Sequence, residues 1–119
     1  LIKAKEVKAL NDVNITADQM AIIRQGFYDV VNSNSSLATG SSLRGRSTVI
    51  SGKTGTAETF TKATNGQTVS AVNLSVVAYD QNNQIAVGVM YSNSSNYLSK
   101  AHQYIARDII DLYVSTFAQ

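Results

Sequence analysis

The sequence predicts an α+β fold in which an antiparallel sheet of three strands packs with helices. Three strand-like segments follow one another along the chain, joined by polar connections of hairpin length. Segments with helical spacing of apolar residues lie before and after them. Consecutive strands flanked by helices are typical of α+β folds, whereas strict alternation would indicate a parallel sheet. The 119 residues are enough for one domain at most.

The first helix is predicted to begin after Thr16. Thr16-Ala17-Asp18-Gln19 has the pattern of a capping box, in which the Thr16 hydroxyl and the Gln19 side chain close the helix start. One face then carries apolar residues at helical spacing: Met20, Ile23, Phe27, Val30 and Val31. The Asn-, Ser- and Gly-rich segment 32–40 ends the helix. Arg44 and Arg46 in the loop 40–47 precede the first strand and could touch a ligand there, but a solvated loop is the favoured interpretation.

The three strands are predicted at 48–60, 68–79 and 84–91. The second is rich in β-branched residues, and the third alternates between apolar and polar positions, as a half-buried strand does. The loop 62–67, which contains Asn65-Gly66, and the connection 80–83 suit two hairpins. Residues 92–96 are expected to form a polar turn.

A last helix is predicted over 99–117. Its apolar stripe consists of Ala101, Ile105, Ile109, Leu112 and Tyr113. Arg107, Asp108 and Asp111 are expected mostly outside that stripe. His102, near the helix start, is expected to face solvent or to cap the helix.

The composition excludes several kinds of site. The chain has no cysteine and one histidine, which excludes disulfides, thiolate chemistry and metal sites built from several imidazoles. A net charge of +2 with scattered basic residues gives no reason to expect a nucleic-acid partner. We therefore expect no metal and no cofactor.

The segment Ser51–Glu58, with the sequence SGKTGTAE, has the composition of a site. Lys53 offers a compact ammonium with three donors, suited to a carboxylate or to a neighbouring hydroxyl. Thr54 and Thr56 add hydroxyl donors on residues that a strand accepts well. The absence of a side chain at Gly55 allows another backbone to approach closely. Such a strand edge can pair with an extended peptide.

A phosphate-binding loop is the competing interpretation of Gly52-Lys53-Thr54. That motif requires a glycine five positions before Gly52, where this chain has Ser47. It also requires a helix after Thr54, whereas the residues there are β-branched and glycine-bearing. A nucleotide site is therefore disfavoured.

The Lys53-Thr54-Gly55 triplet resembles one of the three signatures of the penicillin-recognising serine enzymes. The longer run 51–58 is similar to the form found in class B penicillin-binding transpeptidases, and the resemblance covers most of residues 16–117. It implies that residues 1–119 are the C-terminal part of one transpeptidase domain with the penicillin-binding/β-lactamase-like fold.

The resemblance also implies roles for the residues of the triplet and for Thr56. Lys53 and Thr56 would be catalytic, Lys53 through proton transfer and electrostatics and Thr56 through a backbone N–H in the oxyanion hole. Lys53, Thr54, Gly55 and Thr56 would bind substrate, with the Thr54 and Thr56 hydroxyls receiving its terminal carboxylate. The substrate would be a peptidoglycan stem peptide ending in D-Ala-D-Ala, with β-lactams as inhibitors.

The chain departs from the family pattern in two respects. No serine is followed three residues later by lysine, so the nucleophile motif Ser-x-x-Lys is absent. Ser94-Ser95-Asn96 matches Ser-x-Asn but follows the triplet, whereas the family motif precedes it, so we interpret these residues as a turn and cap. Both motifs are expected upstream of Leu1, and the chain alone is expected to be inactive.

The predicted function is therefore part of a serine D,D-transpeptidase that cross-links stem peptides through an acyl-enzyme. The expected partner is the remainder of the same domain, as a separate chain or an upstream segment that covers the open sheet edge. We expect the site on the extracytoplasmic face of the plasma membrane, anchored by a segment outside this chain. The alternatives are a serine β-lactamase or D,D-carboxypeptidase of the same fold, and a non-catalytic penicillin-recognising module.

Overall fold

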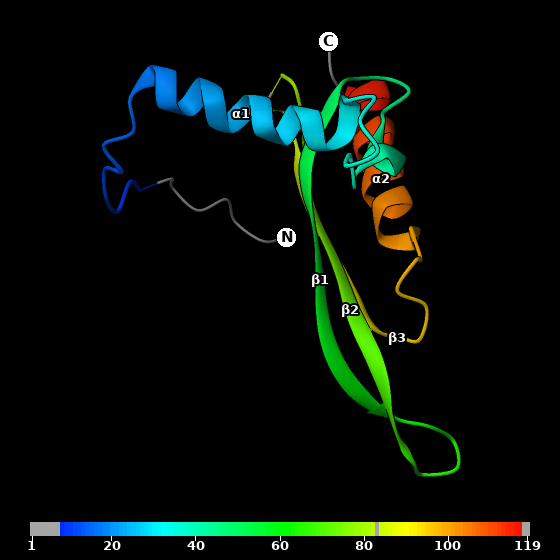
Figure 1. Cartoon of the computed structure of the whole chain (residues 1–119). Coiled ribbons are helices and arrows are strands. Elements are labelled where there is room, and N and C mark those ends of the chain that lie inside the picture. The colour runs from blue at the N-terminus through cyan, green and yellow to red at the C-terminus, as the bar shows by residue number, and fades with distance from the viewer. Residues whose placement is uncertain (1–7, 83, 118–119) are drawn as a thin grey trace.

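The computed structural model describes residues 8–82 and 84–117 (Figure 1). In chain order the elements are the helix α1 (Ala17–Asn32), the short 3-10 helix η1 (Ser41–Leu43), the strands β1 (Ile50–Lys62), β2 (Thr68–Asp80) and β3 (Ala86–Ser94), and the helix α2 (Ala101–Phe117). The predicted α+β class and the order of its elements are confirmed.

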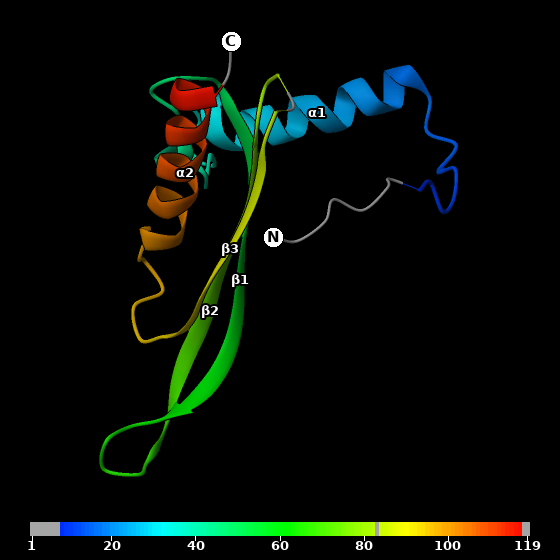
Figure 2. The ribbon, with the colours of Figure 1, turned by 180° about the vertical axis from the view of Figure 1, so that it is seen from behind.

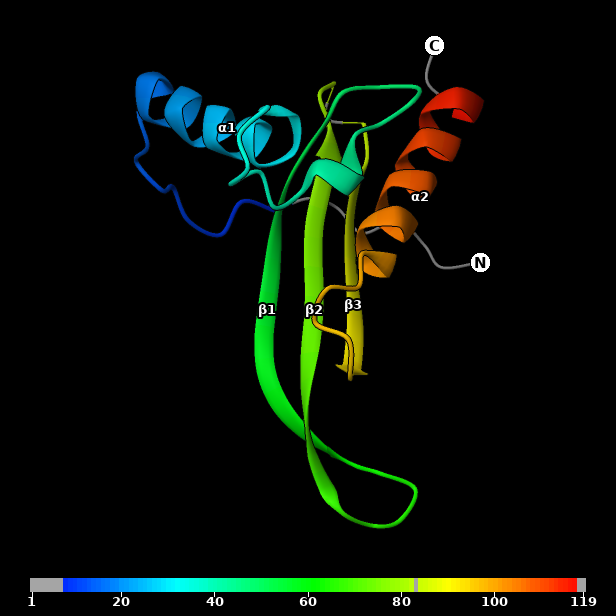
Figure 3. The same ribbon diagram turned by 45° about the vertical axis from the view of Figure 1, so that its right-hand side comes forward.

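The sheet has the order β1-β2-β3, and both pairs are antiparallel. The β1–β2 pairing runs from Ile50 opposite Asp80 to Lys62 opposite Thr68. The β2–β3 pairing ends where Val72 meets Ser94. Beyond that point β1 and β2 continue as a two-stranded ribbon (Figure 3). Strand β1 is therefore at an edge of the sheet. It contains the segment Ser51–Glu58 and is called the site strand.

Helix α2 covers one face of the sheet, whereas α1 runs across the strands near the start of β1 (Figure 2). The end of α1 reaches the α2 face, where Val31 joins the core. Alternate residues of β2 (Leu74, Val76, Ala78) are buried and share one face, the face covered by α2. The core there contains Val31, Leu43, Ile50, Val76, Ala78, Ala106 and Ile110. On the other face, Phe27 of α1 makes an edge-to-face contact with Tyr79 at 6.3 Å between ring centroids.

The capping box at the start of α1 is confirmed. The backbone N–H of Gln19 donates to the Thr16 hydroxyl at 3.2 Å, and the N–H of Thr16 donates to Gln19 Oε1 at 2.9 Å. At the other end of the helix, the Asn32 side chain donates to the carbonyl oxygen of Ile50 at 2.9 Å. The end of α1 is thereby fixed to the beginning of the site strand.

The connection between β2 and β3 is organised by a buried carboxylate. Asp80 is completely buried and accepts the backbone N–H groups of Asn82 at 2.9 Å, Gln84 at 2.6 Å and Ile85 at 2.8 Å. These bonds compensate for removing the charge from water. The sequence predicted the polar connection but not the burial of its first residue.

The predicted turn over 92–96 is wrong in its first half, because β3 continues to Ser94. The strand passes through an irregularity at Asn93, which has a φ of 55°, a conformation that asparagine tolerates better than most residues. The Asn93 N–H donates to Asn73 Oδ1 at 2.9 Å and so remains bonded to β2. The turn itself is closed by Ser94, whose hydroxyl accepts the Asn96 N–H at 3.1 Å.

Candidate functional site

The segment Ser51–Glu58 lies within β1, as predicted. Because β1 pairs with β2 alone, its other edge has no strand partner among the described residues. The unpaired N–H and C=O groups of such an edge can bind an extended peptide by strand addition. The sequence therefore places its most distinctive residues where a peptide can bind to the backbone.

The strand register separates the candidate side chains between the two faces of the sheet. Thr54 lies opposite the buried Val76 and Thr56 opposite the buried Leu74, so both threonines are on the α2 face. Lys53 lies on the other face and is exposed, and its ammonium donates to the carbonyl oxygen of Thr54 at 2.6 Å. The cation and the two hydroxyls thus leave the edge strand in opposite directions.

The Thr54 hydroxyl has a partner that the sequence analysis missed. Thr54 Oγ1 is 2.8 Å from Oγ1 of Thr39, a residue of the loop between α1 and η1. The Thr39 carbonyl oxygen in turn accepts a hydrogen bond from Nε2 of Gln103 on α2 at 3.1 Å. The three residues are far apart in the sequence and match no motif, so periodicity and spacing gave no signal for this contact.

Thr56 is exposed and borders a surface hollow of about 650 Å³. The hollow lies between the β1–β2 ribbon and the connection from β3 to α2, and its lining also includes Glu58, Phe60, Ser94 and Tyr97. A carboxylate and two aromatic rings beside Thr56 offer polar and apolar contacts to the side chains of an extended peptide.

Gly52 and Gly55 occupy different surroundings. A β-carbon at Gly52 would be 2.6 Å from the backbone carbonyl oxygen of Val77, so only glycine fits this point of the β1–β2 pairing. A β-carbon at Gly55 would be 2.6 Å from the Ser75 hydroxyl, the end of a side chain that can rotate away. The strict steric requirement therefore falls on Gly52, one residue before the triplet.

We expect Gly52→Ala to destabilise the fold by about 1–3 kcal/mol, because a backbone atom has to move to admit the methyl group. Gly26→Ala is the matched control, since nothing lies within 4 Å of its β-carbon position and alanine favours the helix by up to about 1 kcal/mol. Urea unfolding should give shifts of opposite sign. A Gly52→Ala midpoint equal to that of the wild type would refute the steric account.

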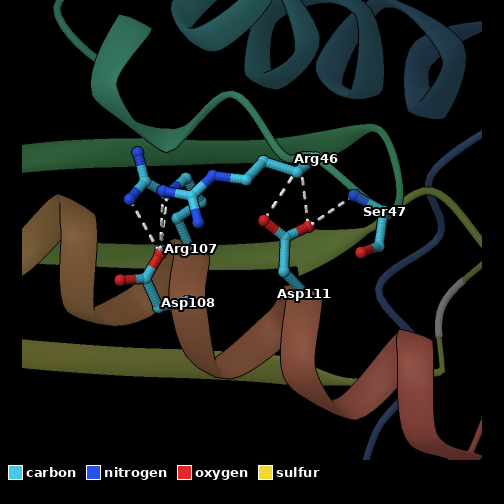
Figure 4. Close-up of polar contacts among 5 residues, drawn as sticks. All are labelled: Arg46, Ser47, Arg107, Asp108 and Asp111. Carbon is cyan, nitrogen blue, oxygen red and sulfur yellow. Dashed lines mark hydrogen bonds and ion pairs between the residues drawn. The ribbon is translucent and has the colours of Figure 1, made fainter.

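The loop that leads into β1 is held by a buried carboxylate of α2 (Figure 4). Asp111 accepts the Arg46 N–H with both oxygens at 2.9 Å and the Ser47 N–H at 2.9 Å. The stripe predicted for α2 is not its buried face, because Ile105, Ile109 and Leu112 are exposed. Asp111, expected mostly outside that stripe, is buried instead, and these N–H groups supply the partners that its burial requires. Helix α2 therefore fixes the entry to the site strand.

The two loop arginines do not reach the triplet. The Arg46 side chain is exposed and lies 3.8 Å from Asp108, which also pairs with Arg107 at 2.7 Å (Figure 4). Arg44 is exposed, yet its guanidinium donates to the carbonyl oxygens of Val31 at 3.0 Å and Ser33 at 2.8 Å. Arg44 thus satisfies carbonyl groups at the C-terminal end of α1.

His102 is buried, so the expectation of a solvent-facing or capping histidine is wrong. The residue is 3% exposed, and Nδ1 of its side chain has no hydrogen-bond partner among the described residues. Burial, and secondarily the positive charge of Lys100, lower the pKa of His102 below the usual 6.5. The neutral imidazole is therefore the form that the folded chain favours.

This burial predicts an acid-sensitive contribution to stability. As the pH falls below 6.5, the unfolded chain binds a proton at His102 before the folded chain does. Stability is thus fully present above that pH and decreases until the lowered folded pKa is passed. Comparing the free energy of unfolding at about pH 7.5 and about pH 5.5 should show a larger loss for the wild type than for His102→Gln. Equal losses would contradict the assignment.

Two further observations concern the part of the chain that the structure describes. No three His, Asp or Glu side chains in it come together in a way that could hold a metal ion. Neither of its α-helices has the length and apolar character needed to cross a membrane.

Comparison with known proteins identifies the family. The family model of the penicillin binding protein transpeptidase domain matches residues 1–111. Penicillin-binding protein 2B from serotype 2 and serotype 4 strains of Streptococcus pneumoniae is 40% identical over 114 residues, which are 95% of this chain and 16% of the relative. The solved structure of pneumococcal penicillin-binding protein 2B matches with a TM-score of 0.81 and 40% identity, over 100% of this chain and 19% of that one. The chain thus spans less than a fifth of these relatives, and it belongs to the penicillin-binding protein transpeptidase family.

Proposed function

We propose that residues 1–119 are the C-terminal part of one transpeptidase domain of a peptidoglycan D,D-transpeptidase, to which they supply the Lys-Thr-Gly strand. The observation that carries this proposal is the position of Lys53-Thr54-Gly55 on an edge strand, in a chain of this family. Edge backbone groups can bind the D-Ala-D-Ala end of a stem peptide as an added strand. The term complete domain means this chain together with the part of the domain that carries the nucleophile.

The reaction has two acyl-transfer steps. The serine oxygen of the Ser-x-x-Lys motif attacks the carbonyl carbon of the penultimate D-Ala, the peptide bond breaks, and the terminal D-Ala leaves with a proton on its amine. An amine of a second stem peptide then attacks the ester, forms the cross-link and returns the proton to the serine. A β-lactam reacts in the first step and remains as the acyl-enzyme, because its leaving group stays attached.

The residues of this chain would act by position and charge. Lys53 is exposed on the free edge strand, where its ammonium can stabilise the developing negative charge and assist proton transfer. The backbone N–H of Thr56 would be one donor of the oxyanion hole, the other belonging to the nucleophile. The hydroxyls of Thr54 and Thr56 would receive the terminal carboxylate, and Gly55 would let the peptide backbone approach.

The nucleophile has to come from elsewhere, because no serine in this chain precedes a lysine by three residues. We propose that the remainder of the domain, as a separate chain or an upstream segment, supplies Ser-x-x-Lys and Ser-x-Asn. Two features favour such a partner: the edge of β1 that has no strand partner in residues 8–82 and 84–117, and the apolar residues Met20 and Ile23, which α1 leaves about 40% exposed. This chain alone is then inactive.

The proposed substrate also indicates on which side of the plasma membrane the site lies. Peptidoglycan lies outside the plasma membrane, so we place the site on the extracytoplasmic face, anchored by a segment outside this chain. The cell-wall partners are stem peptides ending in D-Ala-D-Ala, and β-lactams compete for the same strand.

A peptide ending in D-Ala-D-Ala, offered to the complete domain with an amine acceptor, tests the proposed reaction. We expect release of D-Ala and a new amide bond to the acceptor, detected by mass. Release of D-Ala with the hydrolysed peptide alone would identify a carboxypeptidase, and rapid β-lactam hydrolysis a β-lactamase. Absence of any reaction, with the domain folded, would favour a non-catalytic binding module.

A further inference from the structure

The triplet threonine is connected to helix α2 by two hydrogen bonds in series. Thr54 Oγ1 and Thr39 Oγ1 are 2.8 Å apart, and the Thr39 carbonyl oxygen accepts from Gln103 Nε2 at 3.1 Å. Gln103 is 1% exposed, so its amide is held by packing as well as by this bond. A buried residue on α2 thus holds the loop residue that touches the site strand.

The chemistry of the groups fixes the direction of the Gln103 bond and leaves two directions for the bond between the hydroxyls. The Gln103 amide can only donate to the Thr39 carbonyl oxygen. Between two hydroxyls either can donate, but each has a single hydrogen. A carboxylate only accepts, so Thr54 can bind one only with its own hydrogen. That hydrogen is available when Thr39 donates to Thr54, because the Thr54 oxygen then acts as acceptor.

We infer that Thr39 and Gln103 are positioning residues that orient the Thr54 hydroxyl toward the substrate's carboxylate. The inference rests on the proposed function, since it assumes that Thr54 binds that carboxylate. Gln103 holds the Thr39 backbone, Thr39 donates to Thr54, and the Thr54 hydrogen is directed at the anion. Neither positioning residue has to touch the substrate.

The test compares two β-lactams that differ only in the carboxylate, benzylpenicillin and its methyl ester. The second-order acylation constant of the complete domain is measured for both, and their ratio reports on carboxylate recognition. A general structural disturbance lowers both constants together and leaves the ratio unchanged. Loss of an oriented hydroxyl lowers the constant for the acid selectively.

We expect Thr39→Val to lower the acid-to-ester ratio roughly fivefold, the size of one lost neutral hydrogen bond. Gln103→Met, which keeps the side-chain length but loses the donor, should lower the ratio in the same direction. Thr39→Ser retains the hydroxyl and should restore the wild-type ratio. Gln25→Met is the matched control, because its amide donates to Asp29 within α1 at 2.9 Å, away from the triplet.

The possible outcomes distinguish a failure of the positioning inference from a failure of the proposed function. A lowered ratio in both Thr39→Val and Gln103→Met, with recovery in Thr39→Ser, supports the inference. If Thr54→Val lowers the ratio but Thr39→Val and Gln103→Met do not, the inference is wrong and the proposed function stands. If Thr54→Val leaves the ratio unchanged, the carboxylate role of Thr54 is wrong and the inference fails with it. A wild-type domain that no β-lactam acylates overturns both.

Discussion

Lys53→Ala should slow acylation of the complete domain by benzylpenicillin by about 10²–10³-fold while the domain remains folded. Lys53 is exposed and makes its side-chain hydrogen bond to the neighbouring carbonyl oxygen of Thr54, so the fold does not depend on it. Its expected effect is electrostatic, because a positive charge fixed beside the reacting carbonyl stabilises the transition state more than the ground state. Acylation is measured by a time course of covalent penicillin labelling in quenched samples, and folding by circular dichroism.

Lys62→Ala is the matched control for this substitution. Lys62 is also an exposed lysine of β1, but it lies at the far end of the ribbon, where its ammonium donates to the Thr68 hydroxyl at 2.7 Å. Removing the same charge there should change the acylation rate less than twofold, since exposed charges at a distance are screened. Equal effects of the two substitutions would show that Lys53 acts only through net charge.

Asp111→Ala should lower the free energy of unfolding by about 3 kcal/mol. The buried carboxylate accepts the N–H groups of both Arg46 and Ser47, and alanine leaves these donors without partners. The loop that leads into β1 then loses its attachment to α2. Urea unfolding measures the loss, and slower penicillin acylation should accompany it, because the entry of the site strand is no longer fixed.

Asp108→Ala provides the comparison on the same helix. Asp108 is 55% exposed and pairs with Arg107 and Arg46 at the surface, so its removal should cost about 0.5 kcal/mol or less. The two aspartates are three residues apart and differ in burial rather than in chemistry. Similar losses for both would contradict the assignment of Asp111 as the anchor.

Local patterns were enough to predict the elements of the fold. The capping box at Thr16 and Gln19 involves residues three positions apart, so the sequence contains all of its information. The strands were predicted from β-branched residues and alternation, with ends that differ by at most three residues from those observed. The triplet itself was recognisable because its residues are contiguous.

Contacts between distant segments could not be predicted in the same way. Thr39 is 64 residues from Gln103, and Ser47 is 64 residues from Asp111. A polar residue on a helix looks solvent-facing in a sequence until the fold supplies a buried partner, and this explains the wrong expectation for Asp111. A buried partner does not explain the wrong expectation for His102. Its imidazole is buried although Nδ1 has no hydrogen-bond partner among the described residues.

The central claim is that this chain supplies the Lys-Thr-Gly strand to a serine nucleophile carried outside residues 1–119. The most direct test is to incubate the native protein with benzylpenicillin and to locate the covalent adduct by intact and peptide mass analysis. Our account predicts one adduct, on a serine that precedes a lysine by three residues and lies outside this chain. An adduct on any residue within 1–119, or a folded complete domain that forms no adduct, would contradict it.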